Sequence, residues 1–303
     1  MVNEQFVRTF SHIVLSPDPD LAVAALMIAR VEYARLEAGP YLDHLDRLGW
    51  EAKVRVESAE GTPDAADRAF DPDAYARVKA LNDYLFGVER FVGNNTRYED
   101  PRNSFLNDVI DRRTGIPITL ALIYMEVARR AGLHVEGVNF PGHFLVRVPL
   151  PAGSPYEEDL IVDAFNGGAV LSREMCRALL SRHANDETND RQPDADIFRL
   201  ATKPQILARM LLNLKRLYVR MHSFPQARLV TDLLLATGAS APLELRDRGL
   251  LAYHLRDFAS ALRDLEAYLK LAGSPAIDDD ERSEHEQIWE HVKTLRRRVA
   301  SLN

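Results

Sequence analysis

Few residues in this 303-residue sequence have side chains that could act in catalysis. Cys176 is the only cysteine, and it lies in VLSREMCRALLSRH, which predicts a helix. His143 opens the apolar run HFLVRV, and Asp163 lies in a second such run, DLIVDAF. A histidine whose ring is oriented by a carboxylate can act as a general base toward a thiol, a hydroxyl or water. These residues indicate acid–base or nucleophilic chemistry, provided that the fold brings them together.

Other kinds of site find little support in the sequence. It contains no His-Glu-x-x-His motif, no phosphate-binding Gly-x-x-x-x-Gly-Lys-Ser/Thr loop and no Gly-x-Gly-x-x-Gly run. His285 and His291 are six residues apart, so one helix does not present them on a single face as paired metal ligands. We therefore expect neither a metal nor a cofactor.

Charge and hydropathy argue against several classes of protein. The net charge is −7, and residues 1–200 carry 22 Lys and Arg against 32 Asp and Glu. An acidic body without a basic stripe is not typical of nucleic-acid binding. The sequence shows no basic start followed by an apolar run, and no uncharged apolar segment of about 18 residues. We expect a folded cytoplasmic protein that binds neither nucleic acid nor membranes.

Helical periodicity dominates the first hundred residues. Apolar residues recur at helical spacing from 20 to 48, interrupted by Gly39-Pro40, and again from 74 to 92. This pattern predicts two helices joined by a turn, followed by a third helix. We expect residues 1–99 to form a helical segment that packs on the core.

The next segment, residues 100–183, predicts an α+β fold. Residues 117–131 form an apolar run with little polar face, which is typical of a buried central helix, and Gly132 follows as its stop. Three short runs come next, HVEGV, HFLVRV and DLIVDAF, separated by the turn sequences NFPG and PLPAGSPYEE. That alternation predicts an antiparallel sheet packed against the buried helix.

The pattern changes again after residue 183. Residues 184–198 are rich in Asp and Asn and predict a linker. In residues 199–303, Phe224 and Ala227 recur 34 residues later as Phe258 and Ala261. An aromatic residue three positions before a small alanine, repeated at that period, is the signature of tetratricopeptide helix pairs.

Two details of this C-terminal region depart from a regular array. Lys215 stands where a small residue is expected in the first helix of the first pair. Two repeats are also fewer than the roughly three that stacking usually requires. We therefore expect the pairs to lean on the preceding core and on a last helix at 284–302.

The segment from 100 to 170 resembles the transglutaminase-like proteins of the SirB type, which are bacterial proteins with a transglutaminase-like core followed by tetratricopeptide repeats. The runs that carry the resemblance are DPRNSFLNDVIDRRTGIPITLALIYMEVARRAGL, GVNFPGHFLVRV and IVDAFNGG. With helices in front and repeats behind, the resemblance covers nearly the whole chain. It implies a papain-type core.

The resemblance also implies a catalytic triad that this sequence lacks in part. Active transglutaminase-like enzymes have Gly-x-Cys at the start of the central helix, then a His and an Asp on the following strands. Here the corresponding residues are Gly115, His143 and Asp163, and the cysteine position falls on Pro117. Proline carries no nucleophile, although it suits the first turn of a helix.

Three other sources of reactivity remain open. Thr119 could supply a hydroxyl, although helix geometry turns it by about 200° from residue 117. Cys176 would require an unrelated site, and a buried, inert thiol is the simpler interpretation. His143 with Asp163 could activate water directly, or the two residues could be a structural remnant.

The most direct interpretation is a catalytically inactive protein that binds a protein or peptide, in a regulatory or scaffolding role. Repeats of this type offer grooves for peptide segments. The alternative is a non-thiol hydrolase or amide-processing enzyme that uses His143 and Asp163. Residues flanking the motif runs could line a binding pocket or belong to its scaffold, namely Asn103, Arg112, Arg113, Thr119 and Asn166.

Overall fold

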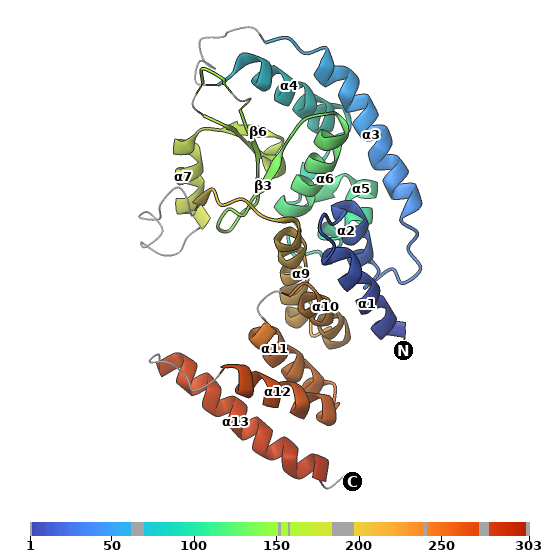
Figure 1. Ribbon diagram of the computed structural model, residues 1–303, viewed down its shortest axis with the longest axis vertical. Helices are drawn as coiled ribbons and strands as arrows, with labels where there is room; N and C mark the ends of the chain where they lie inside the picture. The colour runs from blue at the N-terminus through green and yellow to red at the C-terminus, as the bar shows by residue number, and fades with distance from the viewer. Residues whose placement is uncertain are drawn as a thin grey trace. The chain divides into compact units, whose positions relative to one another are not determined.

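The computed structural model describes most of the chain, and its helices and strands are labelled in Figure 1. The described residues are 2–61, 70–150, 153–156, 158–183, 197–238, 241–272 and 279–300. Their contacts divide the chain into two compact units. One unit, here called the core, comprises residues 20–210, and the other, the repeat unit, comprises residues 1–19 and 211–303.

Three helices open the core. They are α2 (Leu21–Ala29), α3 (Gly39–Glu57) and α4 (Pro72–Asn82), and a π-helical turn, η2 (Asp83–Val88), follows α4. The first two confirm the expected pair of helices, but α2 ends at Ala29, ten residues before Gly39. Eight of the nine residues of α2 are buried, whereas Arg30, which follows them, is exposed.

Helix α6 (Pro117–Arg130) is the central helix of the core, as its apolar sequence predicts, and eleven of its fourteen residues are buried. The helix ends at Gly132, whose φ of 82° is accessible to glycine without strain. Leu133 N–H then donates to the Ala128 carbonyl at 2.9 Å and closes the helix end. Helices α2, α3 and α5 (Leu106–Arg112) pack against α6.

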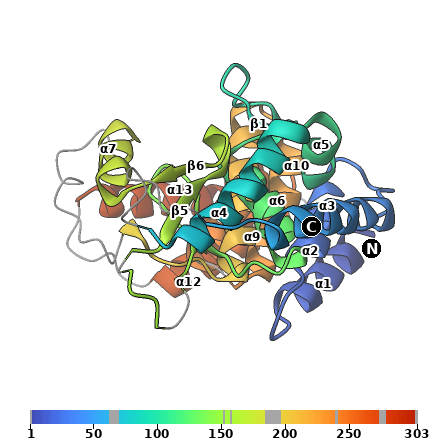
Figure 2. The same ribbon diagram turned by 90° about the horizontal axis from the view of Figure 1, so that it is seen from above.

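The predicted meander is confirmed and has a fourth strand. Strands β3 (Glu136–Val138), β4 (Leu145–Val148), β5 (Leu160–Asp163) and β6 (Ala169–Leu171) form an antiparallel sheet in chain order. Figure 2 shows α6 on one side of this sheet and α7 (Arg173–His183) on the other. The three residues of β6 are too few for a visible alternation, and the sequence analysis did not predict them as a strand.

A second, smaller sheet lies next to the start of α6. Strands β1 (Val92–Gly93) and β2 (Thr114–Gly115) pair in parallel. Between them in the chain are the short helix η3 (Pro101–Asn103) and helix α5. Residues 74–92, predicted as one helix, instead divide into α4, η2 and β1.

The repeat unit contains the predicted helix pairs. Its helices are α9 (Lys203–Arg220), which begins in the core, α10 (Phe224–Ala236), α11 (Ala241–His254), α12 (Phe258–Ala272) and α13 (Asp279–Ala300). Ala227 and Ala261 are both fully buried. Phe224 and Phe258 are the first residues of α10 and α12, so the 34-residue period marks the second helix of each pair.

The first helix of the chain, α1 (Val2–Val14), belongs to this second unit and packs on α10. Its Phe10 and Val14 are buried. Residues 1–99 therefore do not form a single segment on the core. Likewise, residues 199–210 group with the core, although the sequence suggested that the repeats begin at 199. The suggested linker, 184–198, lies almost entirely outside the described residues.

Lys215 has a specific electrostatic role in the repeat unit. It is only 9% exposed, and its ammonium group lies 2.8 Å from a Glu244 carboxylate oxygen and 2.7 Å from one of Asp247. A buried ammonium group requires such partners, because removing it from water costs several kcal/mol. The lysine that replaces the expected small residue is thus accommodated by two acids of α11.

None of the described helices is long and apolar enough to span a bilayer.

Enlarging either buried alanine should destabilise the repeat unit. We expect Ala227→Leu and Ala261→Leu each to lower the free energy of unfolding by about 1 to 3 kcal/mol, because extra methylenes overpack the space between helices. Ala259, exposed on α12, supplies the matched control as Ala259→Leu. Urea unfolding followed by circular dichroism measures all three, and equal midpoints would show that these alanines are not close interhelical contacts.

Candidate functional site

His143 and Asp163 form a buried pair, which confirms that the fold brings them together. His143 Nε2 lies 2.9 Å from Asp163 Oδ1, and the two residues are 4% and 1% exposed. Asp163 ends β5, and His143 lies two residues before β4, the neighbouring strand. Since an ionised carboxylate only accepts hydrogen bonds, Nε2 is the nitrogen that carries the hydrogen.

The Asp163 carboxylate has donors on both oxygens. Oδ1 also accepts from the backbone N–H groups of Phe165, at 3.0 Å, and Asn166, at 3.3 Å. Oδ2 accepts from the Asn166 side-chain amide at 2.7 Å. Asn166, a predicted site residue, therefore holds the carboxylate. Burial alone would raise the pKa of Asp163, but the His143 and Asn166 interactions outweigh it and lower that pKa below its usual range.

Pro117 occupies the first position of α6, as predicted. The preceding residue, Ile116, has extended backbone dihedrals and no capping side chain. Proline is well suited to this position because its fixed φ matches the helix and its missing N–H would have no helical partner. Helix α6 packs against β4 and against η4 (Ala164–Asn166), the turn that follows Asp163.

Asn103 organises a separate buried network beside the start of α6. Its side-chain oxygen accepts from Asn94 at 3.0 Å and from Arg112 at 3.4 Å, while its amide donates to the Arg97 carbonyl at 2.7 Å. The Thr119 hydroxyl donates to the Asn103 backbone carbonyl at 2.7 Å. Three predicted site residues, Asn103, Arg112 and Thr119, thus come together here. Each of them makes a hydrogen bond that stabilises the local fold.

The fifth predicted binding residue, Arg113, has a different environment. It adopts a left-handed conformation at the end of α5, pairs with Glu89 at 2.8 Å and stacks over the Phe91 ring. These contacts connect α5 to the segment that precedes β1. Arg113 is therefore held outside the groups formed around Asp163 and Asn103.

Two aromatic rings connect these two groups. Phe165 lies edge-on to the His143 ring at a centroid distance of 5.9 Å and edge-on to Tyr98 at 6.1 Å. The Tyr98 carbonyl in turn accepts from the Asn103 amide at 3.3 Å. Neither aromatic residue was predicted as part of a site, because isolated aromatic residues in turns form no periodic pattern.

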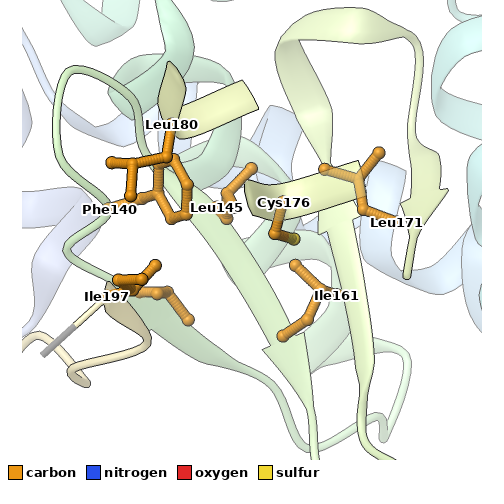
Figure 3. Packing of buried hydrophobic residues seen from close by; sticks show 8 residues of the cluster. Phe140, Leu145, Ile161, Leu171, Cys176, Leu180 and Ile197 are labelled. Carbon is orange, nitrogen blue, oxygen red and sulfur yellow. The ribbon is translucent and has the colours of Figure 1, made fainter. Parts of the chain in front are cut away.

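Cys176 is unavailable as a substitute nucleophile. It lies on α7 in a fully apolar cluster, shown in Figure 3, that includes Leu145, Ile161 and Leu180. Burial, reinforced by the negative charge of Asp163, raises the pKa of the Cys176 thiol to about 12. A thiol with that pKa stays protonated at neutral pH and is a poor nucleophile.

The chemistry open to this arrangement follows from these contacts. An imidazole oriented by a buried carboxylate can accept a proton from an attacking group. Pro117 has no reactive atom, the Thr119 hydroxyl donates to the Asn103 carbonyl, and the Cys176 thiol is protonated, so water is the remaining candidate nucleophile for this pair. No group of three or more His, Cys, Asp or Glu residues within the described part of the chain could hold a metal ion.

The fold agrees with comparisons to known proteins. A model of the transglutaminase-like superfamily matches residues 40–212, and a tetratricopeptide repeat model matches residues 214–289. A UPF0162 protein of Xylella fastidiosa strain Temecula1 is 36% identical over 273 residues, covering 89% of this chain and 91% of that protein. The chain belongs to the transglutaminase-like superfamily and, within it, to the UPF0162 proteins.

More distant similarities reach beyond bacteria. F-box only protein 21 of Mus musculus is 34% identical over 140 residues, covering 45% of this chain and 21% of that protein. A crystal structure of menin aligns with 96% of this chain and 74% of menin, at 12% identity and a TM-score of 0.39. That score is too low to support a conclusion.

Neutralising Asp163 should destabilise the core in a pH-dependent way. We expect Asp163→Asn to lower the free energy of unfolding at pH 7 by about 3 kcal/mol, because it removes a buried carboxylate to which His143, Asn166 and two backbone N–H groups donate. A carboxylate with a lowered pKa stabilises the fold above its unfolded pKa of about 3.9, and that stabilisation disappears as the pH falls through the folded pKa.

Urea unfolding between pH 3 and pH 7 measures this effect. The difference in free energy of unfolding between the wild type and Asp163→Asn should be largest at pH 7 and should decrease toward pH 3. Asp46, two-thirds exposed in its ion pair with Arg130, gives the control Asp46→Asn, for which we expect less than about 1 kcal/mol. A gap independent of pH would contradict the assigned ionisation of Asp163.

Proposed function

We propose that this chain is a catalytically inactive transglutaminase-like protein that binds protein or peptide partners in a regulatory or scaffolding role. One observation carries the proposal: Pro117 stands at the helix start where the superfamily's nucleophile is expected, while the His143–Asp163 pair is retained. The pair then acts as structure or as part of a recognition surface, because an oriented imidazole without a nucleophile cannot form a covalent intermediate.

The repeat unit supports the binding role independently, since tetratricopeptide repeats generally mediate protein–protein interactions. An open hollow of about 980 Å³ lies between Tyr253 of α11 and one face of α13, which contributes Trp289 and His291. Trp289 is 39% exposed. An aromatic side chain with that exposure can supply much of the energy of a protein interface.

The second candidate function is a hydrolase in which His143 and Asp163 activate water. The 2.9 Å hydrogen bond between them favours it, because it orients the imidazole as a general base requires. The near-complete burial of both residues weighs against it, because substrate and water must reach the ring.

Peptide chemistry separates the two candidates. We expect the wild type to show no thiol-dependent transamidation or deamidation of glutamine-containing peptides. Iodoacetamide should leave buried Cys176 unlabelled in the folded protein. Turnover by the wild type that requires no thiol, and that His143→Ala abolishes, would reject the inactive-enzyme proposal and establish the water-activating alternative.

Restoring the thiol tests the geometry behind the proposal. We expect the thiol created by Pro117→Cys to have a pKa below the ~8.5 of a free cysteine, because helix N–H groups and His143 favour the thiolate. The rate of iodoacetamide labelling against pH measures it, with Pro117→Cys/His143→Ala as the control. If the introduced thiol has a pKa near that of a free cysteine in both variants, the proposed site geometry is rejected.

Partner capture tests the binding role directly. Proteins retained by the immobilised full chain are compared with those retained by Trp289→Ala, in which the exposed ring of α13 is removed. Trp50, which is 69% exposed on α3 in the core, provides the matched control as Trp50→Ala. A partner lost with Trp289→Ala and kept with Trp50→Ala supports binding at the repeats, whereas identical capture by both contradicts it.

A further inference from the structure

Residues 139–144 connect β3 to β4, and the part that ends at His143 is here called the 139–143 loop. Within it, the His143 N–H donates to the Phe140 carbonyl at 3.1 Å, and the Phe140 N–H donates to the Val138 carbonyl at 2.8 Å. The His143 carbonyl accepts from a side chain of α9. The position of the His143 ring therefore depends on what holds this loop from outside.

A single arginine of α9 holds both ends of the loop. Arg209 Nη2 donates to the His143 carbonyl at 2.6 Å and to the Phe140 carbonyl at 3.1 Å. Arg209 Nη1 donates to the same Phe140 carbonyl at 3.1 Å and to the side-chain oxygen of Asn139. The guanidinium group also lies over the Phe144 ring, 5.6 Å from its centre.

The chain that leads into α9 docks on the same loop and strand. Asn139 N–H donates to the Arg199 carbonyl at 2.9 Å, and Ala201 N–H donates to the Gly137 carbonyl at 2.8 Å. A Cβ atom on Gly137 would lie 2.8 Å from Phe144 and 3.2 Å from Ile206 of α9. A side chain at 137 would therefore displace the Phe144 ring first and would also press on Ile206.

We propose that Arg209 is a positioning residue, which sets the hydrogen-bonded geometry of His143 and Asp163 by holding the 139–143 loop through its backbone. The proposal rests on the proposed function in one respect: it treats this pair as the retained part of the site. Arginine suits the task because its planar fork of donors can engage several carbonyl oxygens at once, which a lysine ammonium group does with less geometric definition.

Burial and the number of contacts to one loop support this assignment. Arg209 is partly buried, and four of its donor contacts are to neutral oxygens of the 139–143 loop. Losing the side chain would remove these hydrogen bonds from the Phe140 and His143 carbonyls. Hydrogen bonds lost from part-buried carbonyls are unfavourable, so the loop would be held less firmly.

The imidazole N–H resonance of His143 provides a direct test in the full-length protein. A ring N–H that donates to a buried carboxylate is shielded from water, and it gives a slowly exchanging low-field signal in protein labelled with ¹⁵N-histidine. His143→Gln assigns the signal. In Arg209→Ala we expect the signal to be lost or to exchange at least about tenfold faster, because local opening sets the exchange rate.

Two further variants separate positioning from general destabilisation. Arg216, exposed on the same helix, gives the matched control Arg216→Ala, which should retain the wild-type signal. Arg209→Lys keeps the charge and loses the fork, so an intermediate exchange rate is expected. If circular dichroism shows that Arg209→Ala does not fold, Arg209→Lys carries the test.

The resonance experiment tests the positioning role of Arg209 independently of the proposed function. An unchanged signal in folded Arg209 variants, or no protected signal in the wild type, overturns the positioning role. Peptide turnover by the wild type would overturn the proposed function without altering the resonance comparison. Loss of protection in Arg209→Ala, with Arg216→Ala unchanged, establishes the role.

Discussion

The buried carboxylate of Asp163 is the constraint around which the core is arranged. A charge taken out of water must be given hydrogen bonds by its surroundings, or the fold loses several kcal/mol. His143 meets that requirement from the neighbouring strand, and the turn η4 meets it with two backbone N–H groups and the Asn166 amide. The pairing of β4 with β5 and the packing of η4 against α6 maintain this geometry.

Local patterns in the sequence predicted the elements that depend on local physics. The apolar run 117–131 indicated the central helix, alternating runs and turns indicated the sheet, and the 34-residue recurrence indicated the helix pairs. Long-range pairings escaped prediction, because no single sequence contains them. Arg209 lies 66 residues from His143 along the chain, and α1 joins the repeat unit from the opposite end.

The candidate site shows the same division. Motif order together with the family resemblance was enough to place His143 beside Asp163, and the apolar run that begins at Pro117 was enough to place this residue at the helix start. The roles of Asn103 and Thr119 required coordinates, since their hydrogen bonds turn inward to support the backbone around α6. A polar residue next to a motif can thus belong either to a binding pocket or to the scaffold, and only its hydrogen-bond partners distinguish these two roles.

The buried lysine of the first repeat bears on modularity. Tetratricopeptide units are often regarded as interchangeable, because each contacts only its neighbours through small and apolar residues. Lys215 breaks that equivalence, since its ammonium group is compatible only with a following helix that carries acids where Glu244 and Asp247 stand. Transplanted into a consensus array, either helix would bring a charge without its counterpart, so α9 and α11 depend on each other structurally.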